Sequence, residues 1–414
     1  MNILGIFSKS KKKDELVLVF DIGSSSVKAA LFYIRESGVP KIITSIREPI
    51  ILEDKVDPDR FLLLTIQALE TVTNKIYTKG LGAPSRIFCI FSSPWHISQT
   101  RVISYKQDTP FIFTSKLSEE LIQKDIALLK EDYLKKYADA DHALRLIELK
   151  NIKIVLNGYE TIKPLGKKAK EVEMTIFVSM SEEKVCKKIE ETIAKHFTSS
   201  AISSEIKFSP FTLAAFTIIR DLFVDQNNFL LINIGGEITD ISMVKNDILR
   251  ESTSFPLGIN FMIREVASTM KCSLAEAKSL ISLFKDGHAA ANTLNTLEPA
   301  IARLKIEWLK KFQESLANLS NDISIPAFVY TTVDKDLAEF FAEIIKTEQF
   351  NQYTLTESKF QIVFLNIENL HGIAEFGEDS MFNAFLTIDG AYINRFLAKV
   401  PERNFEKFLL QDKI

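Results

Sequence analysis

The sequence predicts an α/β protein of two lobes, with a smaller α+β unit inserted in the first lobe. Two similar strand-turn-strand segments lie far apart in the chain, which indicates a duplicated core. Apolar runs of strand length alternate with helical patterns around both segments. A more highly charged stretch interrupts the first half. At 414 residues the chain is long enough to bury a core in each lobe.

The two similar segments are Leu16–Tyr33, LVLVFDIGSSSVKAALFY, and Phe229–Val244, FLLINIGGEITDISMV. In each, an apolar strand enters a glycine-containing turn and a second apolar strand follows. Glycine has no Cβ, so the backbone N–H groups of such turns can approach an anion closely. Either hairpin alone is typical of a structural turn. The pair predicts a phosphate group held between two turns.

Composition excludes several classes of protein. Hydrophobic residues make up 46% and charged residues 25%, as is ordinary for a globular chain, and the net charge of −3 gives no reason to expect nucleic acid as a partner. Cys89, Cys186 and Cys272 have no metal-binding spacing and suit a reducing cytosol, and the five histidines are dispersed. No apolar run is long enough to span a bilayer, so we expect a cytoplasmic protein.

The first lobe is expected to comprise residues 16–94 and 201–228. After the first hairpin we expect a strand at Lys41–Arg47, a helix at Pro58–Thr78 with an apolar face, and a buried strand at Arg86–Ser92. A helix starting near Pro210 then leads into the second hairpin.

Residues 95–200 are expected to form the inserted unit. A charged helix at Ser118–Tyr137 precedes strands at Leu144–Leu156 and Val172–Met180, with Asn157-Gly158 as a hairpin signal. Nothing in the insertion resembles a catalytic constellation, so we expect it to bind a partner.

The second lobe is expected at residues 229–400, with a helical subdomain at about 258–324. Ser273 and Glu276 have the spacing of a capping box. The other expected elements are helices at Ile259–Met270, Glu298–Leu319, Asp336–Lys346 and Met381–Ile393 and strands at Ala327–Val333 and Phe360–Leu365.

The two ends of the chain, residues 1–15 and 401–414, are expected to be tails. The first, MNILGIFSKSKKK, joins an apolar patch to lysines, and the second places Phe405, Phe408 and Leu409 at helical spacing. For each tail two interpretations stay open: contact with an anionic membrane surface, or an ordinary solvated or packed tail.

The segments DIGSSSVK (Asp21–Lys28) and NIGGEITD (Asn233–Asp240) resemble the two phosphate motifs of the actin-like ATPase superfamily, which has a ribonuclease H-like core. Within it the chain is most similar to the bacterial FtsA and PilM branch. The segments FSPFTLAAF, FPLGINFM and SLAEAKSL follow in the order of FtsA, and NGYETIKPLG resembles the inserted subdomain of FtsA and PilM. The resemblance implies two lobes with ATP and magnesium in the cleft between them.

The resemblance also implies roles for individual residues. Asp21 would hold magnesium through water, Lys28 would neutralise phosphate charge, and Asp21 and Asp240 are the catalytic candidates. The residues expected to bind the nucleotide are Gly23, Ser24, Ser25, Ser26, Lys28, Gly235, Gly236, Thr239 and Glu276.

Four departures from the family pattern surround the same cleft. Asn233 replaces an aspartate, and Ser209 stands where a glutamate often positions the attacking water. Tyr330–Val333 replaces a strand followed by two glycines, and Ile281 replaces a ribose-contacting lysine. They predict a weak or lapsed nucleotide site.

The resulting hypothesis is a scaffold at the inner face of the cell membrane, at most a weak ATPase, that serves cell division or type IV pilus assembly. The insertion would bind a division filament protein or a pilus inner-membrane protein, and self-association is a further expectation. The alternative is a sugar or acetate type kinase of the same superfamily, which needs a carboxylate aimed at a substrate hydroxyl.

Overall fold

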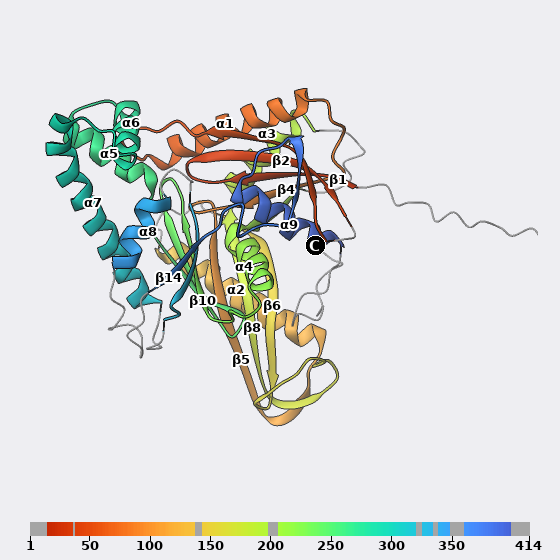
Figure 1. The fold of residues 1–414 in the computed structure, drawn as a ribbon. Helices are drawn as coiled ribbons and strands as arrows, with labels where there is room; N and C mark the ends of the chain where they lie inside the picture. The colour runs from red at the N-terminus through yellow and green to blue at the C-terminus, as the bar shows by residue number, and fades with distance from the viewer. Residues whose placement is uncertain are drawn as a thin grey trace, which may run out of the picture.

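The computed structural model describes residues 15–35, 38–136, 143–197, 206–319, 325–333, 338–347 and 360–398. Figure 1 shows two sheets beside each other and a third, narrower sheet projecting away from them. Both predicted tails lie outside the described ranges, apart from Glu15.

The first-lobe sheet has the order β15-β3-β2-β1-β4-β9. Strand β1 is antiparallel to β2 and parallel to β4, so the predicted hairpin lies at the centre of the sheet. Strands in chain order are β1 (Glu15–Ile22), β2 (Ser26–Ile34), β3 (Lys41–Pro49), β4 (Arg86–Phe91), β9 (Lys207–Pro210) and β15 (Glu375–Asp379).

The second-lobe sheet, β12-β11-β10-β13-β14, repeats this pattern. Strand β10 is antiparallel to β11 and parallel to β13, as β1 is to β2 and β4. The repeated topology confirms the predicted two-lobed α/β architecture. The strands are β10 (Phe229–Ile234), β11 (Thr239–Lys245), β12 (Ile248–Phe255), β13 (Phe328–Thr332) and β14 (Gln361–Phe364).

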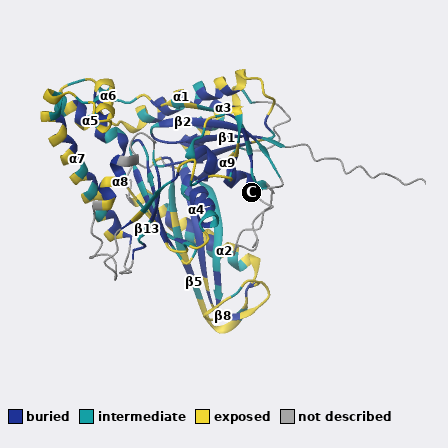
Figure 2. Cartoon of the chain, viewed as in Figure 1, coloured by how far each residue is buried: buried dark blue, intermediate teal, exposed yellow. Residues whose placement is uncertain are grey.

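Helices cover both faces of the first-lobe sheet. On one face, α1 (Pro58–Thr78) and α3 (Glu183–Ala194) share an apolar core with β1, β2 and β4. On the other, α4 (Phe211–Leu222) and α9 (Ala384–Ala398) fill the space between the two sheets. Figure 2 shows these elements dark along their packed sides. Helix α1 has the predicted bounds because Asp57 caps it, accepting the N–H of Arg60, and Pro58 begins it.

Four helices pack on the second lobe around Trp308, which is 1% exposed. They are α5 (Ile259–Met270), α6 (Leu274–Lys285), α7 (Ala291–Asn318) and α8 (Ala338–Thr347). Helix α7 begins before the predicted residue Glu298, and Pro299 lies inside it.

The insertion is a sheet of order β5-β8-β6-β7 with α2 on one face. Its elements are β5 (Ile97–Ile112), α2 (Ser115–Lys136), β6 (Leu144–Leu156), β7 (Tyr159–Glu160) and β8 (Lys168–Glu182). Helix α3, which was expected within the insertion, packs instead in the first-lobe core through Val185 and Ile189.

The last described elements return to the first lobe, although residues up to 400 were expected in the second. Strand β15 pairs with β3, with Phe376 opposite Ile42. Helix α9 packs on β1, β2 and α4 through Ile388 and Tyr392. The chain therefore crosses between the lobes a second time after β14.

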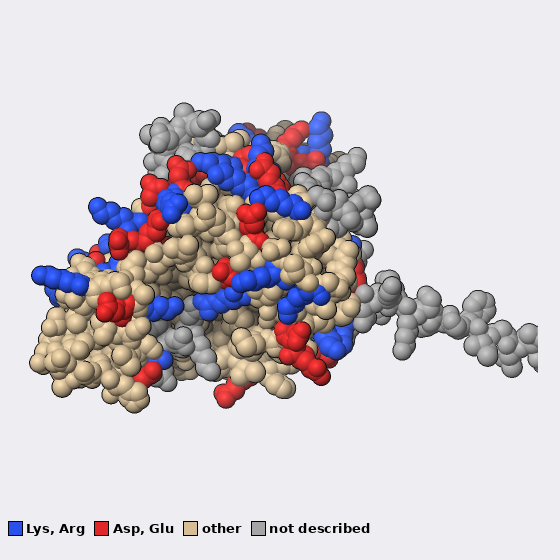
Figure 3. Space-filling model, turned by 90° about the horizontal axis from the view of Figure 1, so that it is seen from above, with Lys and Arg blue, Asp and Glu red and all other residues tan. Residues whose placement is uncertain are grey.

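Two surface features bear on function. No helix in the ranges given above combines the length and the apolar character needed to cross a bilayer. Seen from above, Lys and Arg side chains alternate with Asp and Glu (Figure 3). On α3, Lys184 pairs with Asp59, and Lys195 lies just beyond its end and pairs with Glu70.

Candidate functional site: a closed interlobe cleft

The structure brings the two predicted turns into direct contact. The backbone N–H of Glu237 donates to Ser24 Oγ at 3.1 Å. A Cβ placed on Gly236 would lie 2.6 Å from the carbonyl oxygen of Ser24 and 2.8 Å from the backbone nitrogen of Ser25. Only a residue without a side chain fits this approach. The turns meet across the lobes as expected, but the space between them is filled by the turns themselves.

Most groups expected to bind phosphate already have partners inside the protein. The N–H of Gly23 donates to Ser26 O at 3.2 Å, and the N–H of Gly235 donates to Ile238 O at 2.9 Å. The buried Thr239 hydroxyl donates to Leu257 O at 2.7 Å. These donors stabilise the turns and their surroundings instead of pointing into a vacant site.

Lys28 forms an ion pair with Asp21 across the first hairpin. Their Nζ and Oδ2 atoms are 2.6 Å apart, and both side chains are almost fully buried. The two residues are directly opposite in the β1–β2 register, which places both side chains on one face. The ammonium also lies 4.0 Å from the centroid of the Phe385 ring. Lys28 therefore neutralises Asp21, and neither charge is free for phosphate or magnesium.

A second carboxyl group lies beside this pair. Asp389 on α9 is fully buried, and both of its oxygens lack a hydrogen-bond partner among the described residues, as does Asp21 Oδ1. Burial raises the pKa of Asp389 well above its ordinary value, the negative charge of Asp21 raises it further, and Lys28 opposes the change. We therefore expect Asp389 to be neutral, which leaves the cluster with balanced charge.

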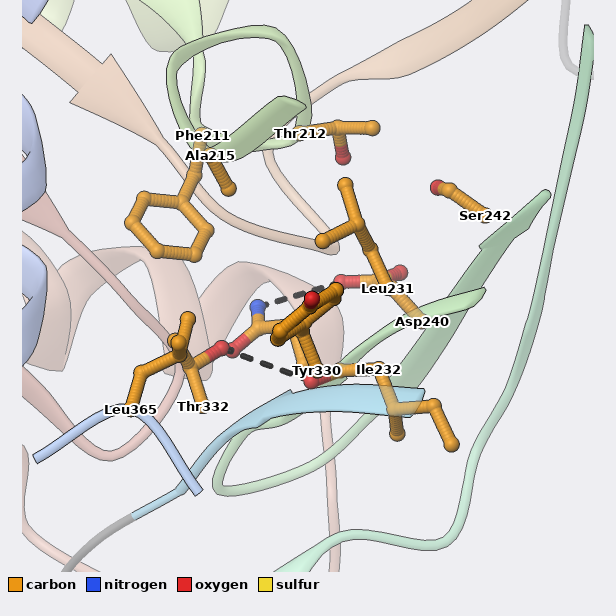
Figure 4. A pocket seen from close by; sticks show the side chains of 11 residues that line it. Phe211, Thr212, Ala215, Leu231, Ile232, Asp240, Ser242, Tyr330, Thr332 and Leu365 are labelled. Carbon is orange, nitrogen blue, oxygen red and sulfur yellow. Dashed lines mark hydrogen bonds between the residues drawn. The ribbon is translucent and has the colours of Figure 1, made fainter. Parts of the chain in front are cut away.

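The floor of the cleft is a chain of polar contacts that crosses between the lobes, and Figure 4 shows its second-lobe part around Asp240 and Thr332. Ser93 Oγ of the first lobe donates to Asp240 Oδ1 at 2.6 Å. Asn233 Nδ2 lies 3.4 Å from Asp240 Oδ2, and Asn233 Oδ1 accepts from Thr332 Oγ1 at 3.0 Å. Burial raises the pKa of Asp240 to about 6, against the lowering effect of the Ser93 and Asn233 hydrogen bonds. Asp240 thus holds the lobes together.

The space left in the cleft is small. Beside Asp240 and Asn233 lies a cavity in which the centre of a water molecule can occupy about 20 Å³. A second, between Ser24, Lys28 and Phe385, offers about 10 Å³. Such volumes hold about one water each. A site for a molecule the size of a nucleotide has a volume of roughly 300–1,000 Å³.

Arg264 and the segment that links β3 to α1 close the mouth of the cleft. Arg264 on α5 donates to both Glu237 carboxylate oxygens, at 2.7 and 2.8 Å, and its Nε donates to the carbonyl oxygen of Glu53 at 2.8 Å. Glu53 belongs to the segment that links β3 to α1. In the same segment, the N–H of Ile50 donates to Ser25 O at 3.0 Å, and Leu52 packs on the second-lobe core. This segment joins the first turn to α5.

Three residues that the sequence analysis related to the nucleotide site make structural contacts instead. Ser209 Oγ donates to Glu148 of the insertion at 2.8 Å. Ile281 is a buried member of the second-lobe core. Glu276 was expected to bind the nucleotide, but it is exposed and forms the capping box of α6 with Ser273.

In this conformation the residues do not fit magnesium-ATP. Gly23 N–H, Gly235 N–H, the Thr239 hydroxyl and Lys28 are paired, the turns touch, and Asn233 supplies an amide where a carboxylate would anchor the magnesium shell. Across the part of the chain that the structure describes, no group of three or more His, Cys, Asp or Glu side chains is arranged to hold a metal ion.

Sequence reasoning missed the residues that close the cleft. Ser93, Arg264 and Asp389 make their contacts with segments far away in the chain, which no local pattern reveals. Glu237 lies inside the NIGGEITD motif, but its partner Arg264 does not belong to any motif. The Asp21–Lys28 pair could have been predicted from the sequence, because a hairpin whose midpoint lies between residues 24 and 25 places those two residues opposite each other.

No family model matches the sequence, and no curated protein matches it significantly. The structure is similar to that of a PilM-PilN type IV pilus biogenesis complex, with 12% identity over 93% of this chain and 98% of that chain and a TM-score of 0.56. An Aquifex aeolicus member of the Ppx/GppA family matches with 12% identity over 87% and 74% of the chains and a TM-score of 0.35. A Bacteroides thetaiotaomicron protein with an actin-like ATPase fold matches with 10% identity over 89% and 97% and a TM-score of 0.36.

The two lower scores are too weak to support an inference. The first likeness extends over nearly the whole of both chains and agrees with the repeated sheet order. This chain therefore has the two-lobed actin-like fold.

Proposed function

We propose that this protein is an actin-like scaffold of the FtsA and PilM type, which acts at the cytoplasmic face of the membrane by binding a protein partner. The observation that carries the proposal is the closed cleft, in which the expected phosphate donors hold the protein's own groups. A molecule of this fold that does not turn over nucleotide still presents its surfaces to partners. Pilus assembly is the favoured process, because PilM in complex with PilN shares the fold over 93% of this chain.

Neither of the two catalytic candidates is free to serve the kinase alternative. Asp21 is paired with Lys28, and Asp240 accepts from Ser93, so neither carboxylate is aimed at a substrate hydroxyl. Catalysis by a kinase requires such a carboxylate within hydrogen-bond reach of the hydroxyl.

The proposed partner site is the mouth of a crevice between the insertion and the body; the crevice itself has room for about one water, so a peptide would lie across it. Lys150, Ile152 and Phe177 of the insertion line one side. Leu213, Phe216 and Thr217 of α4, with Leu249 of β12, line the other. The lining is apolar apart from Thr217 and Lys150, whose ammonium lies 5.3 Å from the centroid of the Tyr392 ring, and this chemistry suits a short peptide with apolar side chains and an acidic residue. The partner would be the cytoplasmic segment of a pilus inner-membrane protein of the PilN type.

A binding assay with that peptide tests the proposal. We expect Lys150→Glu to weaken binding about tenfold, because it reverses the charge at the crevice. Lys116→Glu is the matched control, since Lys116 lies on α2 at the opposite face of the insertion sheet. Fluorescence anisotropy of a labelled peptide measures both affinities. An equal effect of the two substitutions, or no binding by the unaltered protein, would contradict the proposal.

A further inference from the structure

The far end of the insertion exposes a group of large apolar side chains, which we call the insertion tip. Tyr159 is 79% exposed, Ile162 65%, Ile112 53% and Leu165 39%. Figures 1 and 2 show this end of β5 and β8 as the outermost and most exposed part of the projecting sheet. Exposed apolar side chains grouped in this way mark a contact surface.

The insertion tip is held in one conformation by backbone and side-chain hydrogen bonds. Asn157 and Gly158 have the positive φ angles of a tight hairpin turn. Asn157 Oδ1 accepts the N–H of Lys170 at 2.8 Å. The N–H of Gly166 donates to Phe113 O at 2.8 Å, and Phe113 in turn donates to Lys167 O at 2.9 Å. The apolar side chains are therefore presented outward by an ordered loop.

Lysines surround the apolar group. Lys163, Lys167, Lys168 and Lys170 are all exposed, and none forms an ion pair with a carboxylate anywhere in the described ranges. Acidic side chains lie nearby as well: Glu160 pairs with Lys153 of β6 at 3.2 Å, and Glu171 of β8 and Asp108 of β5 are exposed. Lys184 and Lys187 of α3, in the first lobe, differ, since each is paired with an acid. The four lysines outnumber the three nearby acids, so the insertion tip is locally positive in a chain of net charge −3.

We propose that the insertion tip docks on an anionic lipid bilayer. Ile112, Ile162 and Leu165 would enter the interface between headgroups and acyl chains, with Tyr159 at headgroup depth. The lysines would lie among the anionic headgroups, to which a cluster of cations is attracted. The surface is convex, so it does not enclose a peptide, and its aliphatic side chains offer no hydrogen bonds to phosphates or bases. A bilayer is the partner whose chemistry matches both the apolar side chains and the lysines of the insertion tip.

The inference does not rest on the proposed peptide partner. The peptide crevice lies against the body of the molecule, whereas the insertion tip is at the opposite end of the same sheet.

Vesicle sedimentation with the full chain tests the inference. We expect the unaltered protein to sediment with phosphatidylcholine vesicles that contain about 30 mol% phosphatidylglycerol and to be released by salt, since surface charge attraction is screened. Ile162→Asp and the double substitution Lys167→Glu with Lys168→Glu should each lower the partition coefficient about tenfold. Leu128→Asp is the matched control, because Leu128 is similarly exposed but lies on α2. It should bind as the unaltered protein does.

Every variant retains both tails, so membrane binding by a tail would leave the two tip variants undiminished and would overturn the inference. Equal sedimentation with pure phosphatidylcholine, or tighter binding to a DNA duplex than to the anionic vesicles, would also overturn it. Circular dichroism of each variant confirms folding before the comparison.

Discussion

Replacing Lys28 with methionine is expected to lower the free energy of unfolding by about 3–5 kcal/mol, the usual cost of removing one partner of a buried ion pair. The substitution leaves the Asp21 carboxylate buried without its cation, beside the buried carboxyl of Asp389. Methionine retains the length and apolar volume of the lysine stem, so the lost stability measures the effect of the missing charge and not that of a cavity. Denaturation with urea, followed by circular dichroism, measures the change.

Lys75→Met is the matched control. Lys75 pairs with Glu48, but its side chain is half exposed, and such pairs contribute less than about 1 kcal/mol. Adding Asp21→Asn to Lys28→Met should restore part of the lost stability, because the uncompensated charge is then removed. If the Lys28 variant were as stable as the Lys75 variant, Lys28 and Asp21 would not form the buried pair.

Gly236→Ala is expected to lower the free energy of unfolding by about 1–3 kcal/mol, as overpacking of a closely packed site does. The added Cβ would lie 2.6 Å from Ser24 O, 2.8 Å from Ser24 C and 2.8 Å from Ser25 N. All three are backbone atoms, so no flexible side chain can move aside and the two turns must separate. Thermal and urea denaturation measure the loss.

Gly390→Ala gives the control for this substitution. A Cβ at Gly390 would meet Pro40 Cγ at 3.8 Å and Ile42 Cδ1 at 3.9 Å, which is ordinary contact distance. Gly390 lies inside α9, where alanine favours the helix by up to about 1 kcal/mol. We expect this variant to be at least as stable as the unaltered protein. Equal stability of the two alanine variants would show that the turns do not touch.

Local sequence patterns predicted most elements of the fold. Alternating and continuous apolar runs identified both hairpins, and the apolar spacing after Pro58 predicted α1 with its observed bounds. The Asn157-Gly158 pair marked the turn after β6. These signals act over a few residues, where propensity and turn chemistry decide the backbone conformation.

The parts that the sequence did not reveal depend on contacts between distant segments. Strand β15 joins β3 through pairs such as Phe376 with Ile42, which no local pattern encodes. The glycines of both motifs lie in the turns as expected, but the partners of the turn residues were not foreseen. Ser24 is bound by Glu237 from the other lobe. The capping-box spacing of Ser273 and Glu276 was sufficient to explain Glu276, whereas its expected role toward nucleotide rested on the resemblance alone.

Calorimetric titration of the purified chain with magnesium-ATP tests most directly whether the protein's own groups replace a nucleotide in the cleft. We predict no saturable heat and no rise in melting temperature up to about 1 mM ATP, which corresponds to a binding free energy weaker than about −4 kcal/mol. Saturable binding below that concentration, lost in Gly236→Ala, would show that the cleft opens to admit nucleotide and would contradict the account.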